Sequence, residues 1–149
     1  METRRKPRSE ALRGVVPAWG LAAAAFMLIL GACSNSITDR DIRYTSLTSL
    51  RSGLGGVTLI DPRSEARFAQ GHIPGAINLS IADVRTSGPQ DPRIRGAGKI
   101  VVYGAGRASA LARAMAKKLM SVGFGDVEVF DGGLAEWSTL YEVETRTGG

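Results

Sequence analysis

The fold is decided by residues 61–76, which read DPRSEARFAQGHIPGA. A short apolar, β-branched run at Val57–Ile60 precedes them, and such a run ending in Asp-Pro predicts a buried strand. The polar residues Arg63–Gln70 predict a short surface helix. Gly75 then predicts a tight turn before a second short strand at Ala76–Leu79. The stretch therefore predicts a strand–helix–strand unit.

The same alternation of strands and helices continues towards the C-terminus. The predicted elements are a surface loop at Thr86–Gly98, a strand at Ile100–Tyr103, a helix at Ser109–Val122, a strand at Val127–Phe130 and a short helix from Gly132 to Trp137. Strands that alternate with helices predict an α/β fold, in which helices cover both faces of a parallel sheet.

Two stretches resemble the motifs of the rhodanese-like domain family. Residues 61–76 carry its Asp-x-Arg, an acid, an aromatic residue and then Gly-His-Ile-x-Gly-Ala. Residues 131–137, which read DGGLAEW, are similar to the Gly-Gly-x-x-x-Trp that closes such domains. The resemblance implies a rhodanese-like parallel sheet of about five strands. It places the domain at residues 39–141, followed by a polar tail at residues 142–149.

Glycine occupies the position of the family's catalytic cysteine. In active members, as the resemblance implies, the strand matching Ile100–Tyr103 ends in a cysteine whose thiolate accepts a sulfane sulfur and passes it on as a persulfide. Here Gly104 follows the strand, and the loop is one residue short. The single cysteine, Cys33, lies upstream of the domain. We therefore expect neither sulfur transfer nor the cysteine-dependent phosphatase chemistry that shares this fold.

The loop after this strand keeps the form of an anion cradle. A glycine-rich backbone that leads into a helix N-terminus presents N–H groups to a small anion, and an arginine adds positive charge. The candidate residues are Gly104, Ala105, Gly106, Arg107, Ala108 and Ser109. Either this loop binds a small anion or metabolite, or it is a structural remnant in which Ser109 caps the helix.

The other motif residues predict structure rather than catalysis. Asp61 and Arg63 are expected to form a polar network at the end of the first predicted strand. His72 is the one histidine of the chain, and nothing in the sequence supplies a nucleophile for it to serve as a base. We expect a hydrogen-bonded structural histidine near Asp61 or Glu65, and we expect Trp137 in the core.

The first 32 residues predict a lipoprotein signal peptide. Five basic residues within the first 13 positions precede an uncharged stretch of 18 residues, Val15–Ala32. Residues 30–33 (LGAC) resemble the bacterial lipobox, in which the cysteine is acylated and the leader is cut before it. Residues 33–38 would then be the lipidated cysteine and a short tether. An uncleaved transmembrane anchor is the alternative, because 18 residues approach the length of a membrane span.

The charge of the chain argues against a nucleic-acid partner. The 149 residues carry a net charge of +5, but the leader holds five bases and two acids, and residues 33–149 retain 14 Lys+Arg against 12 Asp+Glu. Basicity therefore belongs mainly to the export signal. The expected partners are a lipid bilayer, reached through Cys33, and an envelope protein or small anion; no cofactor or metal is expected. Ser34 after the cysteine favours the periplasmic face of the outer membrane in a Gram-negative cell.

One further pattern imitates a dinucleotide-binding fingerprint. Gly104-x-Gly106-x-x-Ser109 follows a strong strand, but serine stands where the third glycine belongs, so the match to a nucleotide-binding site is weak.

Taken together, the motifs and the charge favour a membrane-tethered, catalytically inactive rhodanese-like module that binds a protein or small ligand. The alternative is a sulfurtransferase-related enzyme that uses a partner's thiol, or an unrecognised chemistry at the Gly104–Arg107 loop.

Overall fold

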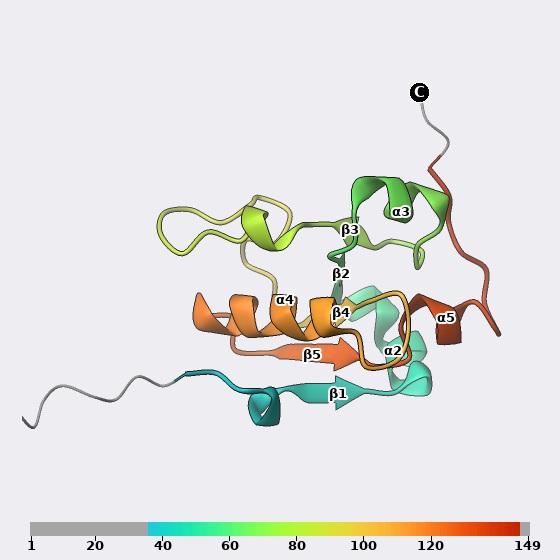
Figure 1. Ribbon diagram of the computed structural model, residues 1–149, viewed down its shortest axis with the longest axis horizontal. Helices are drawn as coiled ribbons and strands as arrows, with labels where there is room; N and C mark the ends of the chain where they lie inside the picture. The colour runs from blue at the N-terminus through green and yellow to red at the C-terminus, as the bar shows by residue number, and fades with distance from the viewer. Residues whose placement is uncertain (1–35, 147–149) are drawn as a thin grey trace, which may run out of the picture. The chain divides into compact units, whose positions relative to one another are not determined.

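The computed structural model describes residues 36–146, which contain a five-stranded parallel sheet (Figure 1). In spatial order its strands are β1 (Arg43–Thr45), β5 (Val127–Phe130), β4 (Ile100–Tyr103), β2 (Thr58–Asp61) and β3 (Ile77–Asn78). Every neighbouring pair of these strands runs parallel. The predicted fold class, a parallel sheet of about five strands, is confirmed.

Helices cover both faces of the sheet because strand side chains alternate between them. On β4, alternate residues enter different cores, namely Ile100 and Val102 against Val101 and Tyr103. The first core is covered by α4 (Ala110–Ser121). The second is covered by α2 (Leu47–Gly53) and α5 (Gly133–Trp137). The remaining helical elements are α3 (Glu65–Gln70) and the short 3-10 turns η1 (Asp39–Asp41), η2 (Leu54–Gly56) and η3 (Ile81–Asp83).

The sequence does not predict β1 and α2, because both have few buried side chains. β1 is a three-residue edge strand in which Arg43 and Tyr44 are exposed. Helix α2 buries only Leu50, and its start is fixed by the Ser46 side chain, which caps its first turn. Helix α3 begins at Glu65 rather than Arg63, since the Arg63 backbone N–H is bound by a side chain outside the helix.

The segment after α5, part of the predicted polar tail, is bound to the domain. His72 and Glu144 exchange backbone hydrogen bonds of 2.9 Å in both directions. The Trp137 indole N–H donates to the Glu142 carbonyl at 2.9 Å. The Arg146 backbone N–H also donates to the domain, at the end of α3. We call residues 142–146 the C-terminal strap.

The whole sheet and both cores lie in one compact unit within residues 36–146. This unit therefore holds every element that it needs to fold on its own. The predicted signal peptide and Cys33 lie outside the residues that the structure describes. Between residues 36 and 146, no helix is both long enough and apolar enough to cross a membrane.

Candidate active-site loop

Strand β4 delivers residues 104–109 to the carboxyl edge of the sheet, where they lead into α4. Ala108 adopts a left-handed backbone conformation with φ of 55°, which turns the chain into the helix. The Ser109 hydroxyl caps that helix by accepting a hydrogen bond from the Ala112 N–H at 3.3 Å. The predicted capping role of Ser109 is confirmed.

Gly104 is buried and has no room for a side chain. A Cβ at this position would collide with the Cβ and the Oγ of Ser109. It would also contact the Ala112 methyl group at 3.6 Å. The helix cap therefore fills the space into which a side chain at position 104 would project. A side chain could enter at position 104 only if Ser109 moved and gave up its capping hydrogen bond.

The Gly-Gly pair before α5 allows that helix to dock against the loop. The Leu134 N–H donates to the Gly104 carbonyl, and the Ala135 N–H donates to the Ala105 carbonyl, both at 2.9 Å. A Cβ at Gly133 would lie only 2.6 Å from the Gly104 carbonyl oxygen. The backbone φ of Gly133 is 60°, which also favours glycine. The N-terminal N–H groups of α5 thus hold the loop in place.

Two carboxylates neutralise the side chain that was expected to attract an anion. The Arg107 guanidinium lies 3.4 Å from the Asp131 carboxylate and 3.2 Å from that of Glu136. Asp131 also accepts the Ala108 backbone N–H at 2.9 Å. The loop therefore already binds a negative group of its own. Sequence reasoning missed both acids, although residues 131–136 follow the strand next to β4, and parallel strands end at one edge.

Part of the cradle stays open. Among residues 36–146, nothing accepts a hydrogen bond from the backbone N–H groups of Ala105, Gly106 or Arg107. Ala105 also lines a cleft of about 290 Å³. Arg67 of α3 and Val143 of the C-terminal strap line the same cleft. Three successive N–H groups can hold a small anion. The loop therefore offers unpaired N–H donors, with Ala105 beside the cleft, but no room for a side chain at Gly104.

Asp61 and Arg63 form the predicted polar network. Their side chains are 0% and 9% exposed, and the carboxylate accepts Arg63 Nε at 2.9 Å and Nη2 at 2.6 Å. Arg63 Nη2 also donates to the Gly71 carbonyl at 2.7 Å. Burial disfavours the cation, but the hydrogen bonds and charge of Asp61 outweigh it, so the pKa of Arg63 is raised. The network ties the end of β2 to the end of α3.

Tyr103 extends this network across the sheet, and no pattern in the sequence predicts this role. Its hydroxyl accepts the Ile73 backbone N–H at 3.1 Å. Burial raises the pKa of Tyr103, and the charge of Asp61 raises it further, so the hydroxyl stays protonated. Tyr103 thus holds the segment before β3 against β4, one residue before the loop.

His72 is structural, as predicted, but its predicted neighbours are wrong. Its Nδ1 lies 2.9 Å from the Phe68 carbonyl oxygen, and its ring stacks on the Phe68 ring at 3.7 Å. Its Nε2 lies 3.4 Å from the Glu144 carboxylate of the strap. Asp61 and Glu65 are not its partners, because the chain turns at the end of α3 and folds the ring back over that helix.

The two remaining motif residues behave as predicted. Gly75 has a φ of 77°, in the left-handed region that a tight turn requires. Trp137 is 2% exposed and belongs to the second core. Among residues 36–146, no group of three His, Cys, Asp or Glu side chains is placed to hold a metal ion.

A family model decides the classification. The model of the rhodanese-like domain matches residues 46–140, from the cap of α2 to the residues after α5. This chain belongs to the rhodanese-like domain family. The resemblance of the two motifs to this family is thereby confirmed.

Relatives and solved structures agree with this classification. The thiosulfate sulfurtransferase GlpE of Pseudomonas fluorescens is 35% identical over 96 residues, which cover 62% of this chain and 81% of GlpE. The rhodanese-like domain of Alr3790 from Anabaena superposes with a TM-score of 0.55 at 28% identity, over 71% of this chain and 84% of that one. RPA3614 of Rhodopseudomonas palustris, a possible tyrosine phosphatase, has a TM-score of 0.59 at 24% identity, over 71% and 87% of the two chains, and shows the fold alone.

Proposed function

We propose that this chain is a rhodanese-like binding module without persulfide chemistry of its own, held at a membrane of the cell envelope by a lipidated Cys33. The observation that carries the catalytic part is the filled space at Gly104. A persulfide needs a thiolate beside the loop N–H groups, and Ser109 occupies the space into which a side chain at position 104 would project. The GlpE relative is a thiosulfate sulfurtransferase. The 104–109 loop of this chain carries no cysteine, and we therefore do not extend that activity to it.

The module binds its ligand or partner at the carboxyl edge of the sheet. The open N–H groups of Ala105, Gly106 and Arg107 suit a small oxyanion, and Arg67 adds positive charge to the adjoining cleft. Leu140 and Tyr141, 70% and 36% exposed, follow α5 close to this edge and supply apolar contact area for a protein. We expect thiosulfate or sulfate to shift the NMR signals of these three N–H groups, whereas chloride at equal ionic strength leaves them unchanged.

A second function is supported by the same open N–H groups. A partner protein's cysteine persulfide carries a negative terminal sulfur, which these donors would bind as they would bind an oxyanion. The chain would then assist sulfur transfer without its own thiol. Adding a thiol-bearing partner protein and thiosulfate would reveal it as turnover that neither component gives alone.

The filled space at Gly104 is tested by two coupled substitutions in residues 36–149. Gly104→Cys should lower the free energy of unfolding and give little thiosulfate:cyanide turnover, because its side chain collides with Ser109. Gly104→Cys/Ser109→Gly should recover part of that stability, with Ser109→Gly alone as the control for the lost cap. If Gly104→Cys alone keeps wild-type stability and turns over rapidly, the loop is a competent cradle and the proposal fails.

The anchor is tested separately in the full chain. We expect wild type to incorporate labelled palmitate and to fractionate with membranes, and Cys33→Ser to lose the label. A Cys33→Ser chain that is still labelled would refute the lipoprotein assignment. A Cys33→Ser chain that is unlabelled but still spans the membrane would favour the uncleaved anchor.

A further inference from the structure

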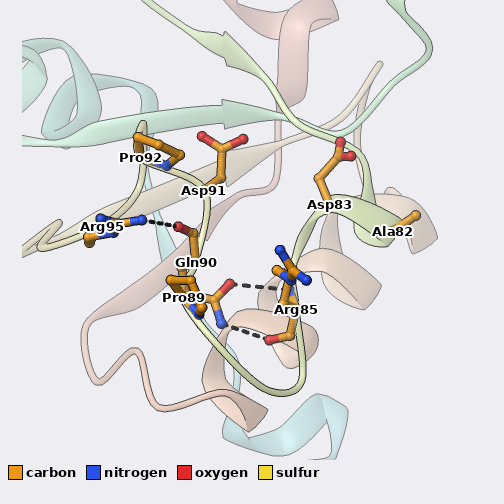
Figure 2. A pocket seen from close by; sticks show the side chains of 8 residues that line it. All are labelled: Ala82, Asp83, Arg85, Pro89, Gln90, Asp91, Pro92 and Arg95. Atoms are coloured by element: carbon orange, nitrogen blue, oxygen red, sulfur yellow. Dashed lines mark hydrogen bonds between the residues drawn. The ribbon is translucent and has the colours of Figure 1, made fainter.

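The loop between η3 and β4 is held in a fixed shape, although it is rich in proline and glycine. Val84 and Ile94 are buried at 2% and 0% exposure and anchor it in the first core. Between them, the Gln90 side chain donates to the Arg85 carbonyl at 2.7 Å and accepts the Arg85 N–H at 3.2 Å. Figure 2 shows this clasp, with Arg95 donating to the Gln90 carbonyl from the other side of the turn. The side chains on this loop are therefore presented in a defined arrangement.

Three cations of this region have no carboxylate partner. Arg85 lines two adjoining clefts of about 450 and 520 Å³, the first together with Arg95 and the second together with Lys118 of α4. Among residues 36–146, no carboxylate lies within ion-pair distance of any of these three groups. We call Arg85, Arg95 and Lys118 the basic triad.

The acids beside the triad are occupied by other groups. Both oxygens of Asp91 are bound by the Arg93 guanidinium, at 3.0 and 2.8 Å. Asp83 accepts the Ser80 N–H at 2.8 Å and its hydroxyl at 2.7 Å. Asp91 is therefore neutralised by Arg93, whereas Asp83 keeps its negative charge. The three cations of the triad outnumber that one remaining carboxylate, which leaves a net positive charge for a partner outside the domain.

The triad lies at the end of the sheet where the described chain begins. Figure 1 shows the 85–98 loop and residues 36–42 at this amino edge, away from α5. Asp39, at the base of the predicted tether, binds Lys117 Nζ at 2.6 Å, and Lys118, the next residue of α4, belongs to the triad. Residues 33–38, if extended, reach about 20 Å. A lipid on Cys33 would therefore hold this edge close to the bilayer.

We propose that the basic triad binds the phosphate groups of anionic lipids and orients the domain, with its amino edge on the membrane and the 104–109 loop facing away. This inference rests on the proposed tether for its place in the cell, but the lipid contact itself needs no acyl chain. Each basic residue near an anionic surface strengthens binding on the order of fivefold, and salt weakens the attraction.

Vesicle sedimentation of residues 36–149 tests the contact. We expect binding to phosphatidylcholine vesicles that contain one-quarter phosphatidylglycerol, little binding to phosphatidylcholine alone, and release in high salt. Arg85→Gln/Arg95→Gln/Lys118→Gln should lower the partition coefficient on the order of a hundredfold. The matched control Arg51→Gln/Arg146→Glu also removes three units of positive charge, but away from the triad, and should bind within about twofold of the wild-type domain. Unfolding curves of the triad variant and of the control establish that both are folded.

Four results would overturn the proposal. They are equal binding to neutral vesicles, no binding to the anionic ones, an equal loss in the control variant, or displacement by millimolar inorganic phosphate, which would indicate a site for free phosphate. An acidic protein captured by the domain in place of vesicles would make the triad a protein contact. Because this assay uses no Cys33, a failure of lipid binding is distinguishable from a failure of the palmitate experiment.

Discussion

The tripeptide Asp-Pro-Arg occurs twice in this domain, and the two copies make the same set of hydrogen bonds. In residues 61–63 and 91–93, the aspartate accepts the backbone N–H of the arginine two positions on, and it also binds that arginine's Nε and Nη2. The copies differ in burial: the aspartate and arginine side chains are 0% and 9% exposed in the first, against 20% and 49% in the second.

This difference decides what each copy does. The first copy lies at the carboxyl edge of the sheet, where its charges are removed from water and must satisfy each other. The second lies in the exposed loop beside the basic triad, where water competes for the same groups. We therefore expect the same local motif to contribute strongly to the stability of the domain in the first copy and only modestly in the second.

Removing the buried aspartate should have the largest effect. Asp61→Ala leaves the Arg63 cation buried without its partner, and we expect the free energy of unfolding to fall by about 3–5 kcal/mol. Urea unfolding at neutral pH measures it. A loss below about 1 kcal/mol, the range of exposed ion pairs, would show that the two copies are equivalent after all.

Asn78 contacts both copies, so its removal should give an intermediate effect. Its side-chain amide donates to the backbone carbonyls of Asp61 and Arg63 at 2.9 and 2.7 Å. Its own backbone carbonyl accepts a hydrogen bond from Arg93 Nη1 at 2.9 Å. Asn78→Ala removes only the side-chain bonds, and we expect a loss of about 1–3 kcal/mol. In a double-mutant cycle it should couple to Asp61→Ala and add independently to Asp91→Ala. Coupling to Asp91 instead would reverse this assignment.

Removing the exposed aspartate should have the smallest effect. The hydrogen bonds of Arg93 lower the pKa of Asp91 to about 2. A lowered pKa means that the ionised pair stabilises the domain above the unfolded value near 4, and that this contribution is lost as pH falls towards 2. Solvent screening limits it to below about 1 kcal/mol. Unfolding curves of wild type and Asp91→Ala should therefore differ slightly at pH 7 and converge as pH falls through 2. A difference that stays constant from pH 7 to below pH 2 would contradict the assignment.

The sequence predicts those parts of the fold that depend on apolar runs and on motif residues. Strands β2, β4 and β5 with their buried side chains, the short strand β3, helix α4 and the Asp61–Arg63 pair follow from local pattern. Strand β1 does not, because its place in the sheet is fixed by pairing with β5 rather than by its own polar residues. The similarity of the two Asp-Pro-Arg copies is visible in the sequence, but their difference in burial depends on the tertiary structure.

The candidate site shows the same division. Glycine at position 104 is visible in the sequence and already indicates that no thiolate stands there. That Ser109 fills the space, and that Asp131 and Glu136 neutralise Arg107, depends on how α4 and α5 meet the end of β4. The neighbours of His72 were wrongly predicted for the same reason, since the strap reaches it from far along the chain.

The central claim is that this rhodanese-like domain performs no sulfur transfer with a thiol of its own. The most direct measurement is thiosulfate:cyanide turnover by the full chain, beside Cys33→Ser and a heat-denatured control. We predict that neither protein exceeds the denatured control, because glycine stands at position 104, where the resemblance to active members implies a cysteine, and Ser109 fills the space beside it. Turnover by wild type that disappears in Cys33→Ser would place a working thiol at Cys33, and turnover by both would reveal another chemistry; either result would contradict the account.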